Sequence, residues 1–396
     1  MTANPPQRLT GSGLRVLVVT GGIALMTAAL LADQAWWDRH FLPLYFFSRA
    51  DFVLGERLAR LAGACIGILL ILAGSPLRRM ANRSTPAALG FGLLRLLLAA
   101  GLALALGERL LGHDYKFAAA ETQPGEEPPR QPDARLGWVF TPSHDGKTIV
   151  GERMISYSTD ALGYRVAGQN APVDVAQPSI LFTGESIVAG YGLNWDETIP
   201  ARVGAALNTQ SATLAVFGYA NDQAYLRLMS ELPRFRRPVA VISLFLPSLL
   251  ARNLGDDRPH LGPGLRWLPA VHRLRLSALF RFLVPYHSEA KIEQGIQLTR
   301  DELLATADLA RRRGAIPLVV DPQFGSETPV ERMIRRRILE ESGLAYVRVM
   351  LDPSWHLKGD LHPNARAADA IAMAIATRLR SELGRQAAWR KDGAAD

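Results

Sequence analysis

The stretch SILFTGESIVAG, residues 179–190, decides the fold of the larger part of this chain. Its first five residues are a short apolar run of the kind that forms a buried strand. The run passes through Gly184 into a loop that carries Ser186, and an apolar segment follows. A strand, a glycine-containing turn and a helix start, in this order, predict one unit of an alternating α/β structure.

The same alternation continues toward the C-terminus. Further strands are expected at 212–217, 239–246, 316–320 and 345–350, with helices near 198–208, 222–232, 297–313, 328–342 and 364–384. This order predicts a parallel sheet covered by helices on both faces, a three-layer α/β/α domain. Functional sites in such a domain lie at the carboxyl ends of the strands.

Ser186 lies at the first of these strand ends. A tight turn there exposes the serine Oγ above the sheet, and the following helix start directs backbone N–H groups at a developing oxyanion. Two roles fit this position: a nucleophile, or a helix N-cap, which serine commonly provides. The segment differs from the G-x-S-x-G nucleophile elbow, because Val188 stands where the second glycine would be.

The stretch GDLHPN, residues 359–364, follows the last expected strand and precedes the last expected helix. A serine hydroxyl is a weak nucleophile until an imidazole takes its proton, and the imidazole needs a carboxylate to fix its tautomer. His362 and Asp360 supply these two groups, also at a strand end. Together with Ser186 they favour a catalytic site over a capping serine and an exposed loop histidine.

These two motifs resemble those of the SGNH (GDSL) hydrolase family. Gly184-Glu185-Ser186 with Gly190 is similar to the first family block, GDSxxxG, and residues 360–364 are similar to the last. The likeness covers roughly residues 135–384, because 136–138 and 160–165 also resemble an extension found in membrane-linked bacterial members. It implies that Ser186 is the nucleophile, His362 the base and Asp360 its partner.

The resemblance also implies an oxyanion hole, with departures from the family pattern. Ser186 and Gly218, which ends the second strand, match the expected backbone donors. The family's third block supplies an Asn after the third strand, where this chain has none before Asn253, so Asn221 or Ser248 is expected to replace it. In addition, Glu185 stands where the family usually has Asp, and Asp360 precedes the histidine by two residues rather than three.

The N-terminal part has the composition of a membrane region. Three apolar runs, at 14–32, 58–75 and 87–107, approach the length of a bilayer core. They predict three transmembrane helices within residues 1–116, with a cleaved signal peptide as the alternative for the first run. Basic residues crowd the flanks assigned to the cytoplasm. This predicts a multi-pass protein of the inner (cytoplasmic) membrane, with the later domain on the periplasmic or extracellular side.

A linker and a globular domain are expected to follow. Residues 117–134 are rich in Pro and Glu and predict an extended linker, and 135–388 form the SGNH-like domain. Short strand-like pieces at 135–165 predict small β ornaments. Within an insertion at 252–296, residues 265–286 mix Arg with large apolar residues, which suits a lid, a helix resting on the membrane or ordinary packing.

Composition and charge exclude several classes of protein. The chain has 396 residues, of which 48% are hydrophobic, so it can bury large cores and is not dominated by disorder. Its formal net charge of +8 is concentrated before residue 120, which argues against a nucleic-acid partner for the larger domain. The eight histidines lack metal-ligand spacing and no nucleotide fingerprint occurs, so neither a metal nor a cofactor is expected.

The resulting functional hypothesis is a membrane-anchored serine esterase. It would act on acyl esters, with acetyl the first choice, of an envelope glycan or a small molecule through an acyl-serine intermediate. One alternative is an O-acyltransferase that uses the same intermediate to modify an extracellular polysaccharide. Another is a non-catalytic glycan-binding module of an envelope-polymer assembly. The implied partners are the acylated substrate, membrane lipid and other envelope-assembly proteins.

Overall fold

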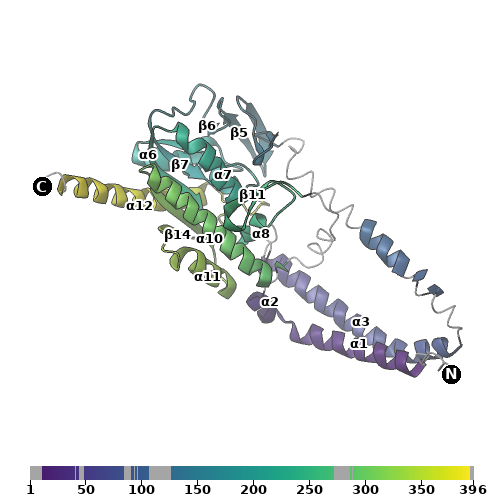
Figure 1. Ribbon diagram of the computed structural model, residues 1–396. Helices are drawn as coiled ribbons and strands as arrows, with labels where there is room; N and C mark the ends of the chain where they lie inside the picture. The colour runs from purple at the N-terminus through teal and green to yellow at the C-terminus, as the bar shows by residue number, and fades with distance from the viewer. Residues whose placement is uncertain are drawn as a thin grey trace, which may run out of the picture. The chain divides into compact units, whose positions relative to one another are not determined.

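A computed structural model describes most of the chain, in two compact units. The described residues are 11–40, 42–43, 49–83, 91–92, 94–95, 97–106, 126–271, 286–287 and 289–392. One unit comprises residues 1–113 with 275–286, and the other comprises 114–274 with 287–396. Figure 1 follows both from the N-terminus in purple to the C-terminus in yellow.

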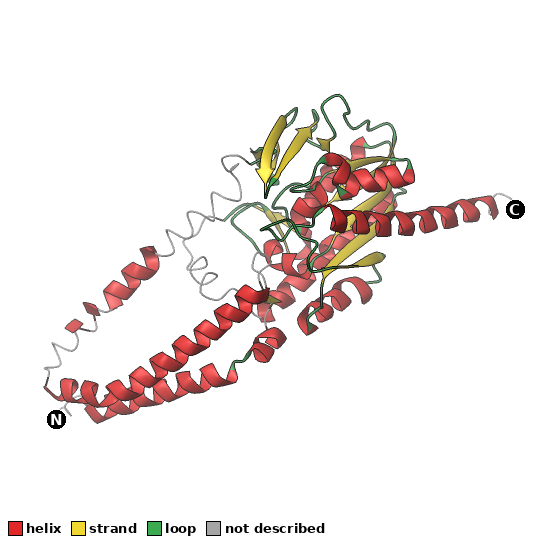
Figure 2. Cartoon of the chain, turned by 180° about the vertical axis from the view of Figure 1, so that it is seen from behind, coloured by secondary structure: helices red, strands yellow, loops and turns green. Residues whose placement is uncertain are grey.

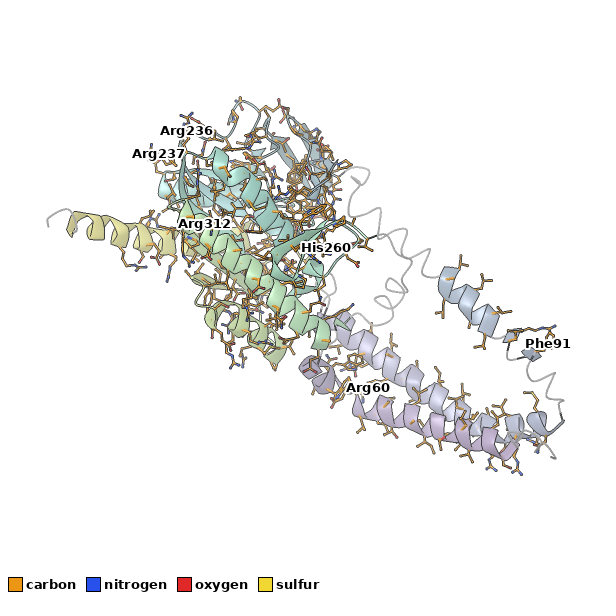
Figure 3. All side chains as sticks on the ribbon, in the orientation of Figure 1. Arg60, Phe91, Arg236, Arg237, His260 and Arg312 are labelled. Carbon is orange, nitrogen blue, oxygen red and sulfur yellow. The ribbon has the colours of Figure 1, made fainter. Side chains whose placement is uncertain are left out.

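The N-terminal unit is built on two long helices, α1 (Gly11–Leu31) and α3 (Arg49–Arg83). They pack closely at Gly22 and Gly67, where a Cβ added to either residue would lie within 3 Å of the other's carbonyl oxygen. Arg60 of α3, labelled in Figure 3, donates from Nε to the Ala29 carbonyl at 2.7 Å. Small residues that let two backbones approach are typical of helix pairs in membranes. The short elements of this region are α2 (Gln34–His40) and the two-residue strands β1 (Leu42–Pro43) and β12 (Tyr286–His287).

The expectation of three transmembrane helices is only partly met. Two helical segments among the described residues, Ser12–Leu31 and Val53–Met80, are long and apolar enough to cross a membrane. Their large apolar side chains are mostly exposed, as Leu17 (68%) and Leu72 (67%) illustrate, so neither resembles the core helix of a soluble protein. Of the third run, 87–107, the described part includes an apolar helix of only ten residues, Leu97–Leu106. Among the described residues there are therefore two candidate spans, where the sequence predicted three.

The larger unit contains an eight-stranded sheet in the order β14-β13-β9-β7-β8-β6-β5-β4. The five strands from β14 to β8 pair in parallel, as the alternation predicted. Their chain order across the sheet places β7 between β8 and β9, so the direction of winding reverses beside β7. Such a switch point is where open α/β sheets bind their ligands. The bounds are β7 (Pro178–Thr183), β8 (Gln210–Thr213), β9 (Arg237–Leu244), β13 (Ile316–Phe324) and β14 (Tyr346–Leu351).

Helices cover both faces of this sheet, which gives the three predicted layers (Figure 2). On one face α12 packs on α6, β13 and β14, and on the other α10 packs on α7, β9 and β13. Beneath α7 and α10, a cluster of buried side chains that includes Leu181, Leu214 and Phe235 forms part of the core. The helices are α5 (Ser186–Ala189), α6 (Ile199–Leu207), α7 (Asn221–Glu231), α8 (Leu250–Asn253), α10 (Glu289–Arg312), α11 (Pro329–Arg335) and α12 (Ala365–Asp392). The expected helix 328–342 is α11 followed by a π-helical turn, Arg336–Glu340.

The β segments before β7 do more than the small ornaments that the sequence predicted. β4 (Asp145–Val150), β5 (Arg153–Thr159) and β6 (Arg165–Val166) continue the main sheet as antiparallel strands, because Arg165 pairs with Thr213 of β8. Before them, β2 (Arg130–Asp133) pairs with β3 (Gly137–Phe140). Residues 130–133 of the predicted linker thus lie in a strand, whereas its residues 117–125 lie outside the described part of the chain.

The insertion after β9 contains α8 and a hairpin of β10 (His260–Gly262) and β11 (Arg266–Leu268). Residues 272–285, which include most of the stretch considered as a lid or a membrane-resting helix, lie outside the described residues.

Candidate active site

Ser186 lies in the turn after β7, whose conformation depends on Gly184, on Gly190 and on the helix cap that Glu185 provides. Gly184 has φ +154°, and a Cβ there would lie 3.1–3.2 Å from Val188 and Leu244, so a larger residue is disfavoured. Glu185 caps the four-residue helix α5, because its Oε1 accepts from the Ile187 N–H at 3.0 Å. Glu185, rather than Ser186, therefore performs the capping that the sequence left open for the serine. Gly190 ends α5 with φ +79°.

The structure brings Ser186, His362 and Asp360 together. Ser186 Oγ lies 2.8 Å from His362 Nε2, and His362 Nδ1 lies 2.5 Å from Asp360 Oδ1. Asp360 sits two residues before the histidine, and this spacing still lets the carboxylate reach Nδ1. With the Nδ1 hydrogen directed to the carboxylate, Nε2 is left as an acceptor for the serine proton.

The loop that carries His362 is fixed by its own backbone. Leu357 N donates to the His362 carbonyl at 2.8 Å, and His362 N donates to Asp360 Oδ1 at 2.7 Å. Asn364 then starts α12 by accepting from the N–H groups of Arg366 and Ala367. The imidazole is therefore held between a closed turn and the first turn of a helix.

The surroundings of Asp360 keep its carboxylate ionised. Burial raises its pKa, but the hydrogen bonds and the charge of His362 outweigh burial, so the net pKa is lower than usual. An ionised carboxylate on Nδ1 stabilises the imidazolium that forms when Nε2 takes a proton.

Tyr191 is a neighbour of the imidazole that the motifs did not indicate. Its ring lies 4.4 Å from the His362 ring, centroid to centroid, at 39°. On its other side it meets Phe217 edge-on at 5.4 Å. The only available signal was its position directly after Gly190. His356, by contrast, stacks on Phe324 at 4.1 Å and directs Nδ1 to the Leu361 carbonyl, so it serves the loop.

Two of the predicted oxyanion donors are backbone N–H groups, those of Gly218 and Ser186. Gly218 has φ +78° and is exposed at the end of the segment that follows β8. A Cβ on it would lie 3.3 Å from the Trp138 ring, whose Nε1 donates to the Phe217 carbonyl at 2.8 Å. This contact anchors the Gly218 loop to the β3 segment. The second predicted donor, the Ser186 N–H, lies at the start of α5. The part of both groups in an oxyanion hole stays a prediction.

Asn221 has a structural use that the sequence did not reveal. Its Nδ2 donates to the Leu244 carbonyl at 3.1 Å, and its backbone N–H donates to Asn253 Oδ1 at 2.9 Å. These bonds tie the start of α7 to the end of β9 and to α8. Asn253 in turn binds Thr299 at 2.6 Å, so its amide is engaged within the core. A part for Asn221 in the oxyanion hole stays a prediction, and the Ser248 side chain lies outside the described atoms.

Two arginines near Ser186 were not predicted to matter. Arg165 is 1% exposed and donates from Nη1 to the carbonyls of Ala189 and Gly190 at 2.6 Å, which closes the end of α5. Burial lowers its pKa to about 10. Arg252 of α8 lies with Nη1 3.7 Å from Glu185 Oε2. That same carboxylate oxygen is in contact with Ser186 Oγ.

Within the described ranges, no group of three or more His, Cys, Asp or Glu side chains is placed to hold a metal ion.

No protein-family profile matches the chain, and no curated protein matches it significantly. Several solved structures match the chain. A G-D-S-L family protein from Desulfitobacterium hafniense is 14% identical, with 51% of this chain and 98% of that one covered and a TM-score of 0.31. An acetyl xylan esterase from Butyrivibrio proteoclasticus is 13% identical, with 54% and 66% covered and a TM-score of 0.33. A carbohydrate esterase family 2 enzyme from Corynascus thermopiles is 17% identical, with 56% and 70% covered and a TM-score of 0.34. The chemistry open to Ser186 therefore has to follow from the contacts around it.

Proposed function

We propose that this protein is a serine ester hydrolase that works through an acyl-serine intermediate. The observation that carries the proposal is the continuous chain of contacts from Asp360 through His362 to Ser186 Oγ. A nucleophile, a base and a group that orients the base, each within hydrogen-bond reach of the next, are what nucleophilic acyl transfer requires.

The reaction proceeds in two halves. Ser186 Oγ attacks the ester carbonyl carbon while His362 Nε2 takes the hydroxyl proton. The carbonyl electron pair moves onto oxygen, and the oxyanion is stabilised by the N–H groups of Ser186 and Gly218. Collapse breaks the C–O bond to the alcohol, which leaves with the proton held by His362. Water then repeats these steps on the acyl-serine and releases the acid.

The narrower form of the proposal concerns substrate and location. The substrate is an acetyl ester of an envelope glycan or of a small molecule, as the motif resemblance implies. The chain is held in the inner membrane by its N-terminal helices, with the catalytic unit on the outer side. The two long apolar helices support a membrane anchor. The number of spans and their orientation are part of the proposal.

The direct test measures turnover of a chromogenic acetyl ester by the full chain in detergent. Ser186→Ala and His362→Ala should each lower kcat by about 10³-fold or more. Arg153→Gln is the matched control, because Arg153 is exposed and its ion pair with Glu197 involves neither Ser186 nor His362. A wild-type rate equal to that of both site variants would overturn ester hydrolysis.

A second experiment tests whether water or a sugar hydroxyl accepts the acyl group from Ser186. Adding a soluble sugar acceptor to the same assay and following transfer of the acetyl group by mass spectrometry separates hydrolase from transferase. A hydrolase gives free acetate at an unchanged rate. If acetyl transfer requires both the sugar and Ser186, the activity is O-acyl transfer by the same residues and not hydrolysis.

A further inference from the structure

The segment 189–193 contacts both the nucleophile and the base of the candidate active site. It starts at the end of α5, the helix that begins with Ser186, and the Tyr191 N–H donates to the Ser186 carbonyl at 2.9 Å. The ring of Tyr191 lies 4.4 Å from that of His362, centroid to centroid. The segment therefore joins the turn that carries the serine to the loop that carries the histidine.

A second contact links the segment to the histidine loop. Gly192 has φ +71°, and a Cβ on it would lie 2.3 Å from Leu357 Cδ1. The Leu357 N–H donates to the His362 carbonyl at 2.8 Å. A displacement of the segment would therefore change its contacts at two points of the histidine loop, at the imidazole and at Leu357.

The carbonyl groups of the segment are bound by Arg165 of β6. Its Nη1 donates to the carbonyls of Ala189 and Gly190 at 2.6 Å, and its Nη2 donates to the Leu193 carbonyl at 2.5 Å. A Cβ on Gly190 would lie 2.7 Å from Nη1, so the close approach of the guanidinium requires a glycine there. One side chain thus binds the carbonyls of three of the five residues in the segment.

Arg165 is charged although it is buried. It is 1% exposed, and burial lowers its pKa only to about 10, so it is protonated at pH 7. Its hydrogen bonds among the described residues all go to backbone carbonyls, the fourth to that of Ser156. Buried acceptors that lose their donor cost free energy, so the segment would have to rearrange if the guanidinium were removed.

Tyr157 of β5 binds the same segment at its one remaining polar contact with these strands. The Tyr157 hydroxyl oxygen accepts from the Gly192 N–H at 2.7 Å, and the Tyr157 ring centroid lies 4.2 Å from the Arg165 guanidinium carbon. The strands β5 and β6, labelled in Figure 1, are the antiparallel extension of the main sheet beyond β8. This extension therefore supplies two side chains that fix the segment between Ser186 and His362.

We propose that Arg165 is a positioning residue, which holds segment 189–193 so that Tyr191 keeps the His362 imidazole in line with Ser186 Oγ. The proposal rests on the proposed function. In this role Arg165 exchanges no proton with the substrate and affects the rate only through the segment. Tyr157 supports the segment by a single hydrogen bond and has the smaller effect.

The test is a double-mutant cycle on kcat for the acetyl ester, with Arg165→Lys, Tyr191→Ala and the double variant in the full chain. Lysine keeps the charge, but its single nitrogen does not reproduce the bonds of two guanidinium nitrogens. Arg165→Lys should lower kcat by about tenfold through misplacement of the imidazole, with KM changed by less than about threefold. In the Tyr191→Ala background, where the ring is already absent, it should cost less than about threefold more.

Arg335→Lys is the matched control for the loss of a buried guanidinium. Arg335 is 8% exposed and binds Glu327 and Glu340, neither of which belongs to the segment. This variant should lower the Tm but leave kcat within about twofold of wild type. Thermal unfolding of each variant checks that it is folded at the assay temperature.

Tyr157→Phe is the milder variant, which tests the proposal if Arg165→Lys does not fold. It removes only the hydroxyl that accepts from Gly192 N–H and keeps the ring beside Arg165. We expect kcat to fall by about threefold, and we expect Tyr191→Ala to suppress this loss as well. A Tyr157→Phe kcat equal to that of wild type, together with an unfolded Arg165→Lys, would contradict the positioning role.

The remaining outcomes are equally decisive. Independent effects of Arg165→Lys and Tyr191→Ala would multiply to about 100-fold in the double variant, and this result would overturn the proposal. An Arg165→Lys kcat within about twofold of wild type, or an equal loss in Arg335→Lys, would also overturn it. Equal rates for wild type and Ser186→Ala would instead overturn the proposed function, and the role of Arg165 with it.

Discussion

Asp360 and Asp321 both belong to the larger unit, yet the pKa values of their carboxyl groups shift in opposite directions. The pKa of Asp360 lies below the ordinary aspartate value, although burial alone would raise it. The pKa of Asp321, in β13, is raised to about 6 by burial, which its neighbouring arginines only partly offset. The side chain of Asp321 is 1% exposed, that of Asp360 31%.

Deeper burial of Asp321 and the hydrogen bonds to Asp360 together account for this difference in pKa. Asp360 Oδ1 accepts from both His362 Nδ1 and the His362 N–H. Asp321 Oδ2 has Arg348 Nε at 3.6 Å and Arg335 Nε at 4.0 Å, but no hydrogen-bond partner among the described atoms. Both arginines bind Glu327 more closely, at 3.0 and 2.8 Å. Positive charges within 4 Å are therefore not enough here to keep the pKa of a buried carboxyl group at its ordinary value.

The largest effect on kcat is expected from a change at Asp360, whose carboxylate accepts the hydrogen bond from His362 Nδ1. Asp360→Asn keeps the shape but loses the charge and presents an amide to Nδ1, which favours the wrong tautomer of His362. We expect kcat for the acetyl ester to fall by about 10²- to 10⁴-fold, with KM nearly unchanged. Steady-state kinetics on the full chain measure the change. A kcat within threefold of wild type would show that Asp360 only shapes the loop.

The same variant has a pH-dependent effect on stability. Because the folded-state pKa of Asp360 is lowered, its ionisation stabilises the fold above the ordinary aspartate pKa, and this contribution is lost as the pH falls through the folded-state value. Asp360→Asn should therefore lower the Tm at pH 7 and have less effect in strong acid. This direction is opposite to that expected for Asp321.

Asp321→Asn should stabilise the protein at neutral pH. This effect should be smaller than that of Asp360→Asn on kcat and larger than that of a change at Tyr191. In wild type the folded pKa of about 6 exceeds the ordinary value of 3.8, so stability is full below the ordinary value and falls as the pH rises through about 6. A neutral amide avoids this loss, which is on the order of 2–3 kcal/mol at pH 7. Glu327 continues to pair Arg335 and Arg348 in the variant. Thermal unfolding near pH 4 and pH 7 should show the advantage at the higher pH alone.

The matched control for Asp321→Asn is Asp308→Asn, which removes an exposed carboxylate paired with Arg311 on α10. It should shift the Tm little and equally at both pH values, because surface ion pairs contribute little. A Tm of Asp321→Asn below wild type at pH 7 would mean that the arginines do stabilise the charged form despite their distance.

The parallel strands and their helices could be predicted from the sequence because each is a local pattern. The run at 239–246 corresponds to β9 and that at 345–350 to β14, each within two residues. Joining β4–β6 to the main sheet depends instead on one long-range pair, Arg165 with Thr213, in a strand of two residues. No local pattern indicates such a pair, so these strands were expected as separate ornaments.

The candidate site likewise contains residues that the sequence predicted and residues that it did not. Ser186, His362 and Asp360 are reactive side chains at strand ends, and parallel topology predicts that such ends meet. Their catalytic role stays a prediction. Arg252 and Tyr191 lie next to Glu185 and His362 through contacts between loops, whose paths depend on the whole fold. Arg252 in particular lies in an insertion that the sequence analysis left without a role.

The smallest effect is expected from Tyr191, which restrains the imidazole through its ring rather than through hydrogen bonds. The ring contacts both His362 and Phe217. Tyr191→Ala removes this wall and lets the imidazole leave the line between Asp360 and Ser186 for part of the time, so kcat should fall by about tenfold, or about 1.4 kcal/mol. KM should change little, because the ring faces the base.

Tyr191→Phe is the matched variant that decides how the tyrosine acts. Burial and the nearby charge of Asp360 raise the pKa of Tyr191, so its hydroxyl is neutral at pH 7 and adds no charge to the site. The phenyl ring preserves the packing, and kcat should remain within about twofold of wild type. If Tyr191→Phe were as slow as Tyr191→Ala, the hydroxyl rather than the ring would be the active part. Polar contacts alone would then position the imidazole. Asp360 is held in the same way, by its hydrogen bonds to His362.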